Sequence, residues 1–433
     1  MSALFGTDGI RGVAGEELTS RTAFALGNAL SRLKQNPCVI VGEDTRVSSD
    51  MLALALAAGV ASGGGEVLWG GVLPTAAVSY CVAERKADFG VVVSASHNPA
   101  KYNGLKVFAS DGRKLPEKQE KRCEHYMMGE YAFAGPLSMG RVRPLGGAEG
   151  YAAHLAACCS RPLKGKKFAL DCANGAAGKI APEVFARLGA EVVASGVNRG
   201  GLDVNEGCGA LHPERIRAMT LESGADAGFA YDGDADRLVA CDEKGNIVDG
   251  DKILCIFAAR MQADGSMRES VAVGTTHTNT GAENFLKKLG IRLIRTDIGD
   301  KYVADAMQKS GAQIGGEQSG HIILSDYAVT GDGILTSVKL AELVAEKKLS
   351  RLADIRMLPQ YNASVRVKDK VRVLGDEYLR GFIDRARRGV SRLVVRASGT
   401  EPVVRIFAEA ESMKQARSAV ERVRAEIQAA EEG

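Results

Sequence analysis

The chain has 433 residues, of which 45% are apolar and 25% charged, and its formal net charge is +3 at pH 7. These proportions are those of an ordinary globular protein, and the length is enough for several domains. The small net charge excludes the basic footprint of a nucleic-acid-binding protein. The richest apolar run, 51–61, is far shorter than a membrane-spanning helix, which needs about 18 residues. We therefore expect neither nucleic acid nor a membrane among the partners.

Nine cysteines are scattered along the chain, and no two of them form a Cys-x-x-Cys pair. An odd count without regular spacing predicts reduced thiols. No signal peptide is recognisable in the first residues, so we expect a cytoplasmic location. The neighbouring Cys158 and Cys159 are interpreted as residues of helix packing rather than as a metal or redox pair.

The first element that we predict is a helix over 22–34, with apolar residues at helical spacing. A buried strand follows at 38–42, then a polar loop, and then a helix that ends near residue 62 and that Ser48 or Ser49 could cap. The same order of strand, polar turn, helix and strand starts again at 168–171 and at 270–274. The repetition predicts three related α/β domains, each with a ligand-facing loop at a strand end.

The last part of the chain has a different pattern, with predicted strands at 363–367, 393–396 and 403–408. In the C-terminal helix, apolar residues recur at spacings of three and four, which predicts a face that covers this sheet: Met413, Ala416, Val420, Val423 and Ile427. We predict three related mixed α/β domains, at 1–150, 151–255 and 256–358. A smaller α+β domain follows at 359–433.

A serine loop follows the predicted strand at 91–93. Its sequence is Ser-Ala-Ser-His-Asn-Pro, and Pro99 ends the strand. Ser96 therefore lies at the carboxyl end of a strand, where open α/β sheets bind ligands. Ser94 and Ser96 also fit ordinary turn hydroxyls. A turn signal begins at Tyr102, and if the strand on its far side lies beside the first, the amine of Lys106 can reach the Ser96 hydroxyl.

Three carboxylates alternate with small residues in Asp-Gly-Asp-Ala-Asp, at 232–236. In an extended loop Asp232, Asp234 and Asp236 point the same way and repel one another unless a cation lies between them. Carboxylate oxygens favour a hard ion, Mg²⁺ or Ca²⁺, and Mg²⁺ if the substrate carries phosphate. An EF-hand is excluded because Arg237 takes the place where that loop needs glycine and a strand follows. The alternative is a solvated acidic turn.

Two further loops carry polar groups that suit a phosphosugar. Residues 396–402, together with Arg405, combine arginines, hydroxyls and a glycine in one turn, which predicts a phosphate cradle. The alternative is a hairpin with surface arginines. The sequence Gly-Gly-Glu-Gln-Ser-Gly-His at 315–321 suits sugar hydroxyls, and His321 could move a proton. The stretch 296–301 is a weaker candidate of the same kind.

The N-terminal stretch 5–12 is rich in glycine and carries Arg11, whose guanidinium could hold phosphate. A solvated turn would explain it equally well. Elsewhere the chain has no Walker loop, no Gly-x-Gly-x-x-Gly that opens a helix, no Gly-x-Ser-x-Gly and no His-Glu-x-x-His. Nucleotide-driven chemistry, dehydrogenation and ester hydrolysis therefore lack their usual markers.

Five of these motifs occur in the order found in the α-D-phosphohexomutases, which the chain resembles over essentially its whole length. They are Phe-Gly-Thr-Asp-Gly-Ile-Arg-Gly, Ser-Ala-Ser-His-Asn-Pro, Asp-Gly-Asp-x-Asp-Arg, Gly-Glu-Gln-Ser-Gly-His and Arg-x-Ser-Gly-Thr-Glu-Pro. Residues 4–12, Gln318 and the stretch 208–214 look most like the bacterial phosphoglucosamine mutase branch. The resemblance implies four domains around a central cleft.

It also implies a phosphoserine at Ser96 and one Mg²⁺ per chain, held by the Ser96 phosphate, Asp232, Asp234 and Asp236. Lys106 and His321 match positions that handle protons, and Arg11 matches one that supports the phosphoryl group. The residues that match substrate contacts are His97, Arg237, Glu317, Ser319, Arg396, Ser398, Gly399, Thr400 and Arg405. Ala235 replaces a glycine that is frequent in the metal loop, so the backbone φ angle there is constrained.

The implied reaction interconverts glucosamine 6-phosphate and glucosamine 1-phosphate, with glucosamine 1,6-bisphosphate as intermediate and activator. A phosphoglucomutase or phosphomannomutase of the same family stays open, because contacts at the C2 atom of the sugar decide between them. A non-catalytic phosphosugar-binding protein is a third hypothesis. We expect a phosphosugar substrate and a monomer or homodimer.

Overall fold

The structure is a computed structural model that describes residues 4–6, 8–146, 148–398 and 402–432. It forms two compact units, which are described one at a time. The first comprises Met1–His277 and Leu289–Asp354, and the second comprises Thr278–Lys288 and Ile355–Gly433.

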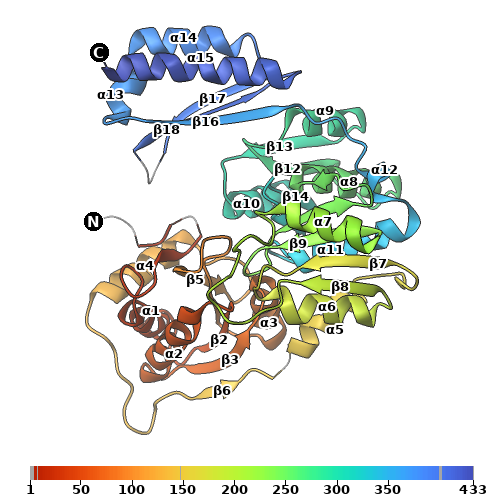
Figure 1. Cartoon of the computed structure of the whole chain (residues 1–433). Coiled ribbons are helices and arrows are strands. Elements are labelled where there is room, and N and C mark those ends of the chain that lie inside the picture. Colours follow the sequence, from red (N-terminus) through yellow and green to blue (C-terminus); the bar gives the residue numbers. More distant parts are fainter. Residues whose placement is uncertain (1–3, 7, 147, 399–401, 433) are drawn as a thin grey trace. The chain divides into compact units, whose positions relative to one another are not determined.

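The first sheet of the first unit has six strands in the order β1-β5-β4-β2-β3-β6 (Figure 1). The strands are β1 Ile10–Val13, β2 Cys38–Glu43, β3 Glu66–Val72, β4 Phe89–Val93, β5 Tyr102–Ala109 and β6 Val142–Pro144. Its helices are α1 Ser20–Leu33, α2 Val47–Ser62, α3 Thr75–Arg85 and α4 Glu117–Met128. Val39 and Val41 of β2 pack in one core with α1 and α2, whereas Gly42 and Gly90 lie against α3. Alternate strand residues thus serve the two helix layers, as the period of two requires.

Three local predictions for this region are wrong. Helix α2 begins at Val47 after Arg46, whose side chain makes no capping hydrogen bond, so neither Ser48 nor Ser49 is the cap. A turn was predicted at Tyr102, but Tyr102 is the first residue of strand β5. Strand pairing with β1 and β4 overrides the local turn preference. The glycine-rich stretch 5–12 is not all loop, since Ile10–Val13 forms edge strand β1.

The second and third sheets belong to the same unit. The second has β7 Lys167–Asp171, β8 Glu191–Ser195, β9 Ala227–Tyr231, β10 Leu238–Asp242 and β11 Ile247–Val248. The third has β12 Val271–Thr275, β13 Arg292–Thr296, β14 Ile314–Gly316 and β15 Ile322–Leu324. Helices α5 Ala148–Ala157, α6 Ala177–Arg187, α7 Pro213–Ser223, α8 Gly250–Ala263, α10 Asp300–Ser310, α11 Gly333–Glu346 and α12 Leu349–Leu352 complete the unit.

The three sheets share one topology. In each, a central strand (β2, β7 or β12) pairs in parallel with two neighbours, and one of these continues into an antiparallel hairpin. The hairpins are β4–β5, β9–β10 and β14–β15. This common connectivity confirms the prediction of three related mixed α/β domains. The proposed boundaries between them stay a prediction.

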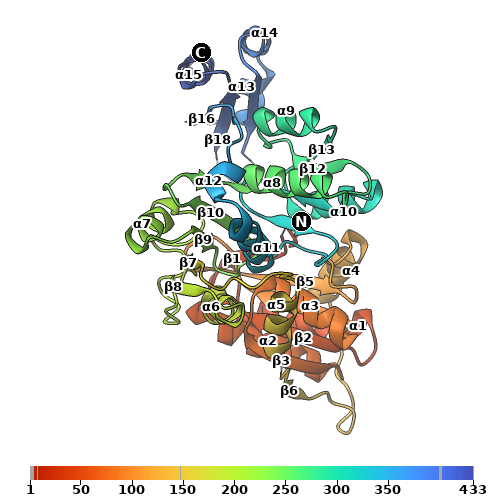
Figure 2. The same cartoon turned by 90° about the vertical axis from the view of Figure 1, so that its right-hand side faces the viewer.

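Helix α5 lies between α3 and α6 and connects the first sheet's helices with those of the second (Figure 2). The ring of Tyr80 on α3 stacks on His154 of α5 at a centroid distance of 4.5 Å. Within the described residues, no helix is long and apolar enough to cross a membrane.

The second unit is built on a three-stranded antiparallel sheet in the order β16-β18-β17. Its elements are α9 Thr280–Lys288, β16 Gln360–Arg366, α13 Lys370–Gly375, α14 Glu377–Arg387, β17 Arg392–Ala397, β18 Val403–Glu409 and α15 Met413–Glu432. Helix α15 packs along the sheet through Val420, Val423 and Ile427, so the predicted α+β domain is confirmed (Figure 1). Met413, placed on the buried face by its spacing, is instead 51% exposed at the first position of the helix.

Glu43, the last residue of β2, is a buried acid at 2% exposure. Its Oε2 has no hydrogen-bond partner among the described residues. Burial, followed by the nearby carboxylates of Asp50 and Asp44, raises the pKa of Glu43 from 4.5 to about 8. The folded protein therefore holds a proton that the unfolded chain releases.

We expect the free energy of unfolding to fall as pH rises from about 5 to about 8, by at most about 1.4 kcal/mol per pH unit from this group. Glu43→Gln keeps the shape of the protonated acid and removes the titration. Urea unfolding at pH 5.5 and 8.5 should show that the variant gains stability over the natural protein only at the higher pH. A difference that is the same at both pH values would contradict the prediction.

Candidate functional site

The three equivalent hairpins carry the predicted chemistry. The serine loop joins β4 to β5, the aspartate loop joins β9 to β10, and the loop with Glu317 and His321 joins β14 to β15. The first two loops meet where the Ser96 Oγ donates to Asp232 Oδ2 at 2.6 Å. The second and third meet where the Leu238 N–H donates to the Gly320 carbonyl at 3.0 Å. Sequence regions about a hundred residues apart thus form one site.

The serine loop is held in a constrained shape. Ser96 has a φ of 53°, in the left-handed region that residues with a Cβ seldom adopt, and it is 1% exposed. Its N–H donates to the Ser94 Oγ at 2.9 Å, and its carbonyl accepts from Asn205 Nδ2 at 2.9 Å. Its hydroxyl also lies 3.3 Å from His97 Nδ1. Contacts from two domains therefore fix the serine.

A buried ion pair between Asp44 and Arg46 supports this loop. The Arg46 Nε donates to Asp44 Oδ2 at 2.8 Å, and both side chains are fully buried. The guanidinium also donates to carbonyls of the serine loop and the start of β5, namely those of Ser96, Asn98, Pro99 and Tyr102, at 2.6–3.0 Å. Asp44 in turn accepts from the Ser94 hydroxyl at 2.6 Å. The planar fork of arginine suits this multiple donation, which lysine cannot reproduce.

The aspartate loop brings three carboxylates together. Oxygens of Asp232, Asp234 and Asp236 lie within 4.8 Å of one another, and all three residues are buried. Asp234 Oδ1 and Asp236 Oδ1 have no hydrogen-bond partner among the described residues. Burial and then repulsion by Asp236 and Asp234 raise the pKa of Asp232 well above its usual value. Buried oxygens that lack partners and repel one another fit a hard divalent cation such as Mg²⁺.

Ala235, at the centre of this loop, has a φ of 59° and is fully buried. The structure thus confirms that the backbone there is constrained. The Ala235 carbonyl accepts from the Gly333 N–H at 3.0 Å, so the start of α11 supports the loop.

Lys106 lies among carboxylates at 2% side-chain exposure. Its Nζ is 2.7 Å from Asp234 Oδ2, 2.9 Å from Asp236 Oδ2 and 3.2 Å from Asp8 Oδ2. Burial alone would lower the pKa of Lys106, but these carboxylates raise it well above its usual value. The amine is therefore a cation that offsets part of the negative charge of the loop.

The remaining charged side chains extend from Asp8. This carboxylate contacts both Arg11 and Lys114, and the Arg11 Nη1 also donates to the Ala95 carbonyl at 3.3 Å. Burial would raise the pKa of Asp8, but Lys106, Lys114 and Arg11 hold it well below its usual value. Arg11 thus lies beside the serine loop.

Two imidazoles border the site. Burial, together with Arg237 and Arg11, lowers the pKa of His97 to about 4, so this ring is neutral at pH 7. His321 is 3% exposed, and its Nε2 lies 3.5 Å from Asp300 Oδ2. Arg237 lies beside Asp232 and Asp236, with its Nε 4.0 Å and 3.9 Å from their carboxylates, and its backbone forms a bridge with His321.

Glu317 and Ser319, in the loop that joins β14 to β15, differ in exposure. Glu317 is 9% exposed, and its Oε1 accepts from the Gly299 N–H at 3.1 Å, which connects it with the weaker candidate stretch 296–301. Ser319 is exposed.

The predicted phosphate cradle belongs to the second unit. Arg396 of β17 and Arg405 of β18 are direct cross-strand partners. Both side chains are exposed, so the phosphate cradle and the hairpin with surface arginines both stay predictions. The Ser398 N–H donates to the Val403 carbonyl at 2.9 Å, and the Ser398 carbonyl accepts from Lys370 Nζ at 2.7 Å. Gly399 and Thr400 lie outside the described residues.

Several residues of the site were not predicted. Arg46, Thr75, Lys114 and Asn205 carried no recognisable motif, although Thr75 Oγ1 lies 2.5 Å from Asp234 Oδ2. Asp44 and Arg46 stood in a loop after a buried strand, where a solvated turn looks the same. Only the tertiary contacts distinguish a buried, structured loop from a solvated turn.

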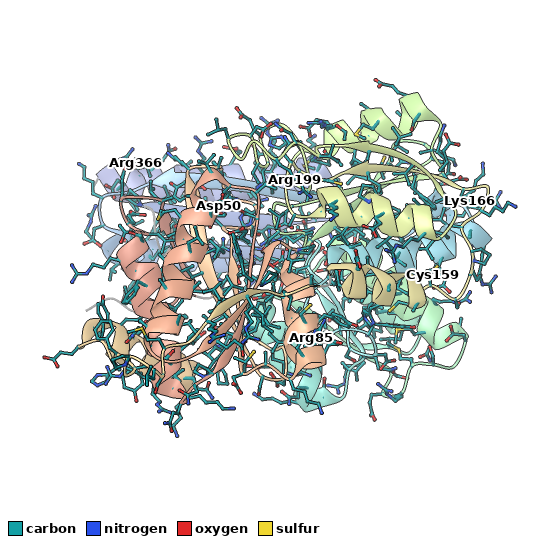
Figure 3. All side chains as sticks on the ribbon, turned by 90° about the horizontal axis from the view of Figure 1, so that it is seen from below. Asp50, Arg85, Cys159, Lys166, Arg199 and Arg366 are labelled. Atoms are coloured by element: carbon teal, nitrogen blue, oxygen red, sulfur yellow. The ribbon has the colours of Figure 1, made fainter. Side chains whose placement is uncertain are left out.

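The cysteines are reduced as predicted, but Cys158 and Cys159 lie just after α5 ends at Ala157, so their assignment to helix packing is wrong. All nine are free thiols. Cys159 follows the end of α5 in Figure 3, and its neighbour Cys158 has Sγ 3.8 Å from His154 Nε2. Burial raises the pKa of Cys158 to about 11, so the thiol stays protonated at neutral pH.

Family models match nearly the whole chain. They describe phosphoglucomutase/phosphomannomutase alpha/beta/alpha domains I, II and III, at residues 2–132, 149–245 and 249–360, and the C-terminal domain, at residues 338–426. A phosphoglucosamine mutase of Thermoanaerobacter sp. (strain X514) is 45% identical, over 94% of this chain and 95% of its own. Another, of Carboxydothermus hydrogenoformans, is 43% identical, over 99% of this chain and 100% of its own.

Solved structures share the fold at lower identity. A phosphoglucomutase/phosphomannomutase family protein of Burkholderia thailandensis is 24% identical, with a TM-score of 0.80 over 99% of this chain and 97% of its own. The N-acetylphosphoglucosamine mutase of Aspergillus fumigatus, solved with GlcNAc-6P and magnesium, is 19% identical, with a TM-score of 0.71 over 99% of this chain and 96% of its own.

We predict that Arg46→Lys destabilises the protein by about 2 kcal/mol or more, because each buried carbonyl left without a donor costs about 1–3 kcal/mol. Urea unfolding checks this. Arg85→Lys is the matched control, since Arg85 is half exposed at the end of α3 (Figure 3) and contacts Glu84 and the Gly146 carbonyl. The control should stay within about 0.5 kcal/mol. Equal losses in both variants would show that Arg46 does not support the loop.

Proposed function

Because the chain belongs to the phosphoglucomutase/phosphomannomutase family, we propose that it is a phosphoglucosamine mutase. Such an enzyme is an isomerase that interconverts glucosamine 6-phosphate and glucosamine 1-phosphate. One observation carries the proposal: a buried serine hydroxyl lies 2.6 Å from a carboxylate of a three-aspartate cluster. The names of relatives that are 42–45% identical support the amino sugar as substrate.

Ser96 would carry the phosphoryl group that is transferred. In the first step the bond between phosphorus and the Ser96 oxygen breaks, and a new bond forms to the free hydroxyl of the sugar phosphate. The sugar hydroxyl gives up its proton, and the Ser96 oxygen takes one up. The product is glucosamine 1,6-bisphosphate. After this intermediate turns end for end, its other phosphoryl group is transferred to Ser96, whose hydroxyl gives up its proton. The sugar oxygen that loses the phosphoryl group takes up a proton. The atoms and charges balance over the cycle.

One Mg²⁺ per chain would be held by Asp232, Asp234, Asp236 and the phosphate on Ser96. When bound, it offsets the roughly −1.5 to −2 charges of the phosphoserine. Lys106 shares two of these carboxylates, so it would keep the loop neutralised as the phosphate leaves and returns. Arg11 and Arg237 would stabilise the charge on the transferring group, which is where such enzymes gain most of their rate.

His321 is the proton carrier that the geometry supports best, because its ring is buried and neither ring nitrogen makes a hydrogen bond among the described residues. Lys106, whose amine the surrounding carboxylates keep protonated, would be a proton donor. His97, neutral at pH 7, would contact the substrate beside Ser96. Glu317 and Ser319 would bind sugar hydroxyls.

Arg396, Ser398 and Arg405, with Gly399 and Thr400, would hold the phosphate that does not react. A phosphate cradle in a different domain from that of Ser96 suits a bisphosphate, because either end of the intermediate must be held while the other reacts. A cytoplasmic location and a monomeric or homodimeric state stay predictions, as does the absence of nucleic-acid and membrane partners.

We predict that Ser96→Ala abolishes mutase turnover, because it removes the only atom that carries the phosphoryl group in this scheme. The measurement is conversion of glucosamine 1-phosphate with Mg²⁺ and the bisphosphate supplied. Mass spectrometry of the natural protein should show one phosphate on Ser96. The mechanism would be overturned if the natural protein carried phosphate on Ser96 and the Ser96→Ala variant nevertheless kept full activity. Failure of Ser96 to accept phosphate would favour the non-catalytic phosphosugar-binding protein.

The sugar preference is tested separately. We expect kcat/KM for glucosamine 1-phosphate to exceed that for glucose 1-phosphate and mannose 1-phosphate by about tenfold or more, about 1.4 kcal/mol of transition-state binding. One phosphorylated preparation with the matching bisphosphates makes the three values comparable. A preference for glucose or mannose would identify a phosphoglucomutase or phosphomannomutase and leave the residue roles unchanged.

A further inference from the structure

A line of ion pairs outside the aspartate loop connects the first α/β domain with His321. The Lys114 Nζ contacts Asp8 and lies 2.5 Å from Asp300 Oδ2 at the start of α10. Asp300 Oδ2 lies 3.5 Å from His321 Nε2. We propose that Lys114 is a positioning residue, which holds Asp300 against His321 and so fixes the imidazole for proton transfer. The inference rests on the proposed mutase function.

Charge explains why Asp300 needs Lys114. Asp300 is 14% exposed at its side chain, and both burial and the neighbouring Asp8 oppose its ionisation. Lys114 is the main group that outweighs them and holds the pKa of Asp300 below its usual value. The amine lies between the two carboxylates, which would otherwise repel each other. Without it, Asp300 would protonate or turn away from the imidazole.

The position of His321 depends on few contacts. A Cβ atom at Gly331 would lie 2.3–2.5 Å from three atoms of the ring, so the backbone of Gly331 packs directly on the imidazole. Among the described residues neither ring nitrogen makes a hydrogen bond, and Asp300 is the carboxylate within ion-pair distance. Gly331 limits where the ring can move, and Asp300 supplies the charge that orients it. An ionised carboxylate beside an imidazole orients the ring.

A second ion pair joins the same two domains. It allows the effect of positioning His321 to be distinguished from the effect of holding the two domains together. The Lys301 Nζ donates to Glu120 Oε2 of α4 at 3.1 Å. Within the described part of the chain, Glu120 forms no hydrogen bond or ion pair with Asp300 or His321, and its side chain is 15% exposed, like that of Lys114. Loss of this pair weakens the attachment of α10 to the first domain and leaves the contact between Asp300 and His321 in place.

The test compares full-length enzymes, phosphorylated on Ser96 and supplied with Mg²⁺ and bisphosphate. We expect Lys114→Met and Asp300→Asn each to lower kcat by about tenfold or more, within the share that positioned acid–base groups contribute, with KM changed by less than about threefold. Lys114→Arg should recover most of the loss. The control Glu120→Gln should keep kcat within about twofold. Because both residues act through one contact, the double variant should be no slower than the slower single variant.

Equal losses in Lys114→Met and Glu120→Gln would overturn the inference, since Lys114 would then only hold the domains together. A raised KM with unchanged kcat would overturn it too. If Lys114→Met does not fold, by circular dichroism and thermal unfolding, Asp300→Asn decides: an unchanged kcat in that variant overturns the proposal. Ser96→Ala is measured in parallel, so that activity without Ser96 refutes the mutase function itself, and an inactive Ser96→Ala beside a fully active Lys114→Met refutes only this inference.

Discussion

The crowding of negative charge is the constraint on which the site depends. Asp8, Asp232, Asp234, Asp236 and Asp300 come from all three α/β domains and are mostly buried. Carboxylates at such distances would protonate or separate unless cations lie among them. Lys106 and Lys114 each contact two or more of them, so the amines join domains as well as neutralise charge. In this site the positive charges of lysine amines offset the negative charges of the carboxylates. Such a site suits phosphate chemistry, because the negative charge of each added phosphate must also be offset by a cation.

Sequence patterns predicted much of this architecture. Buried strands rich in valine, the helices between them and the small C-terminal α+β domain follow from periodicity alone, because burial on both faces leaves a strong apolar signal. The alternation of Asp232, Asp234 and Asp236 with small residues likewise predicted a cluster of carboxylates, which the structure confirms. The structure adds that Ala235 occupies the left-handed region at a φ of 59°, a strain that the surrounding contacts with α11 hold in place.

Other parts of the site could not be predicted from local sequence. The Tyr102 turn signal was overridden because β5 gains ladder hydrogen bonds on both sides, from β1 and from β4. Asp44 and Arg46 form a fully buried ion pair, yet the same two residues in a solvated loop would look identical in sequence. The same holds for Lys114, because its partner Asp300 lies 186 positions further along the chain. Long-range pairing of charge has no periodicity, and so no pattern indicates it.

The polar loops occupy the same place in each of the three related α/β domains, and this explains how one site arises from three domains. The repeated polar turns follow β2, β7 and β12, but the serine, aspartate and histidine loops are the later hairpins β4–β5, β9–β10 and β14–β15. Equivalent loops of related domains converge, and each pair of domains meets through at least one direct contact. Ser96 with Asp232 joins the first to the second, Leu238 with Gly320 the second to the third, and Lys114 with Asp300 the third to the first. Since these three contacts close a ring, displacement of any one domain disturbs its contacts with both neighbours. His321, Ser96 and the aspartate loop are therefore positioned together.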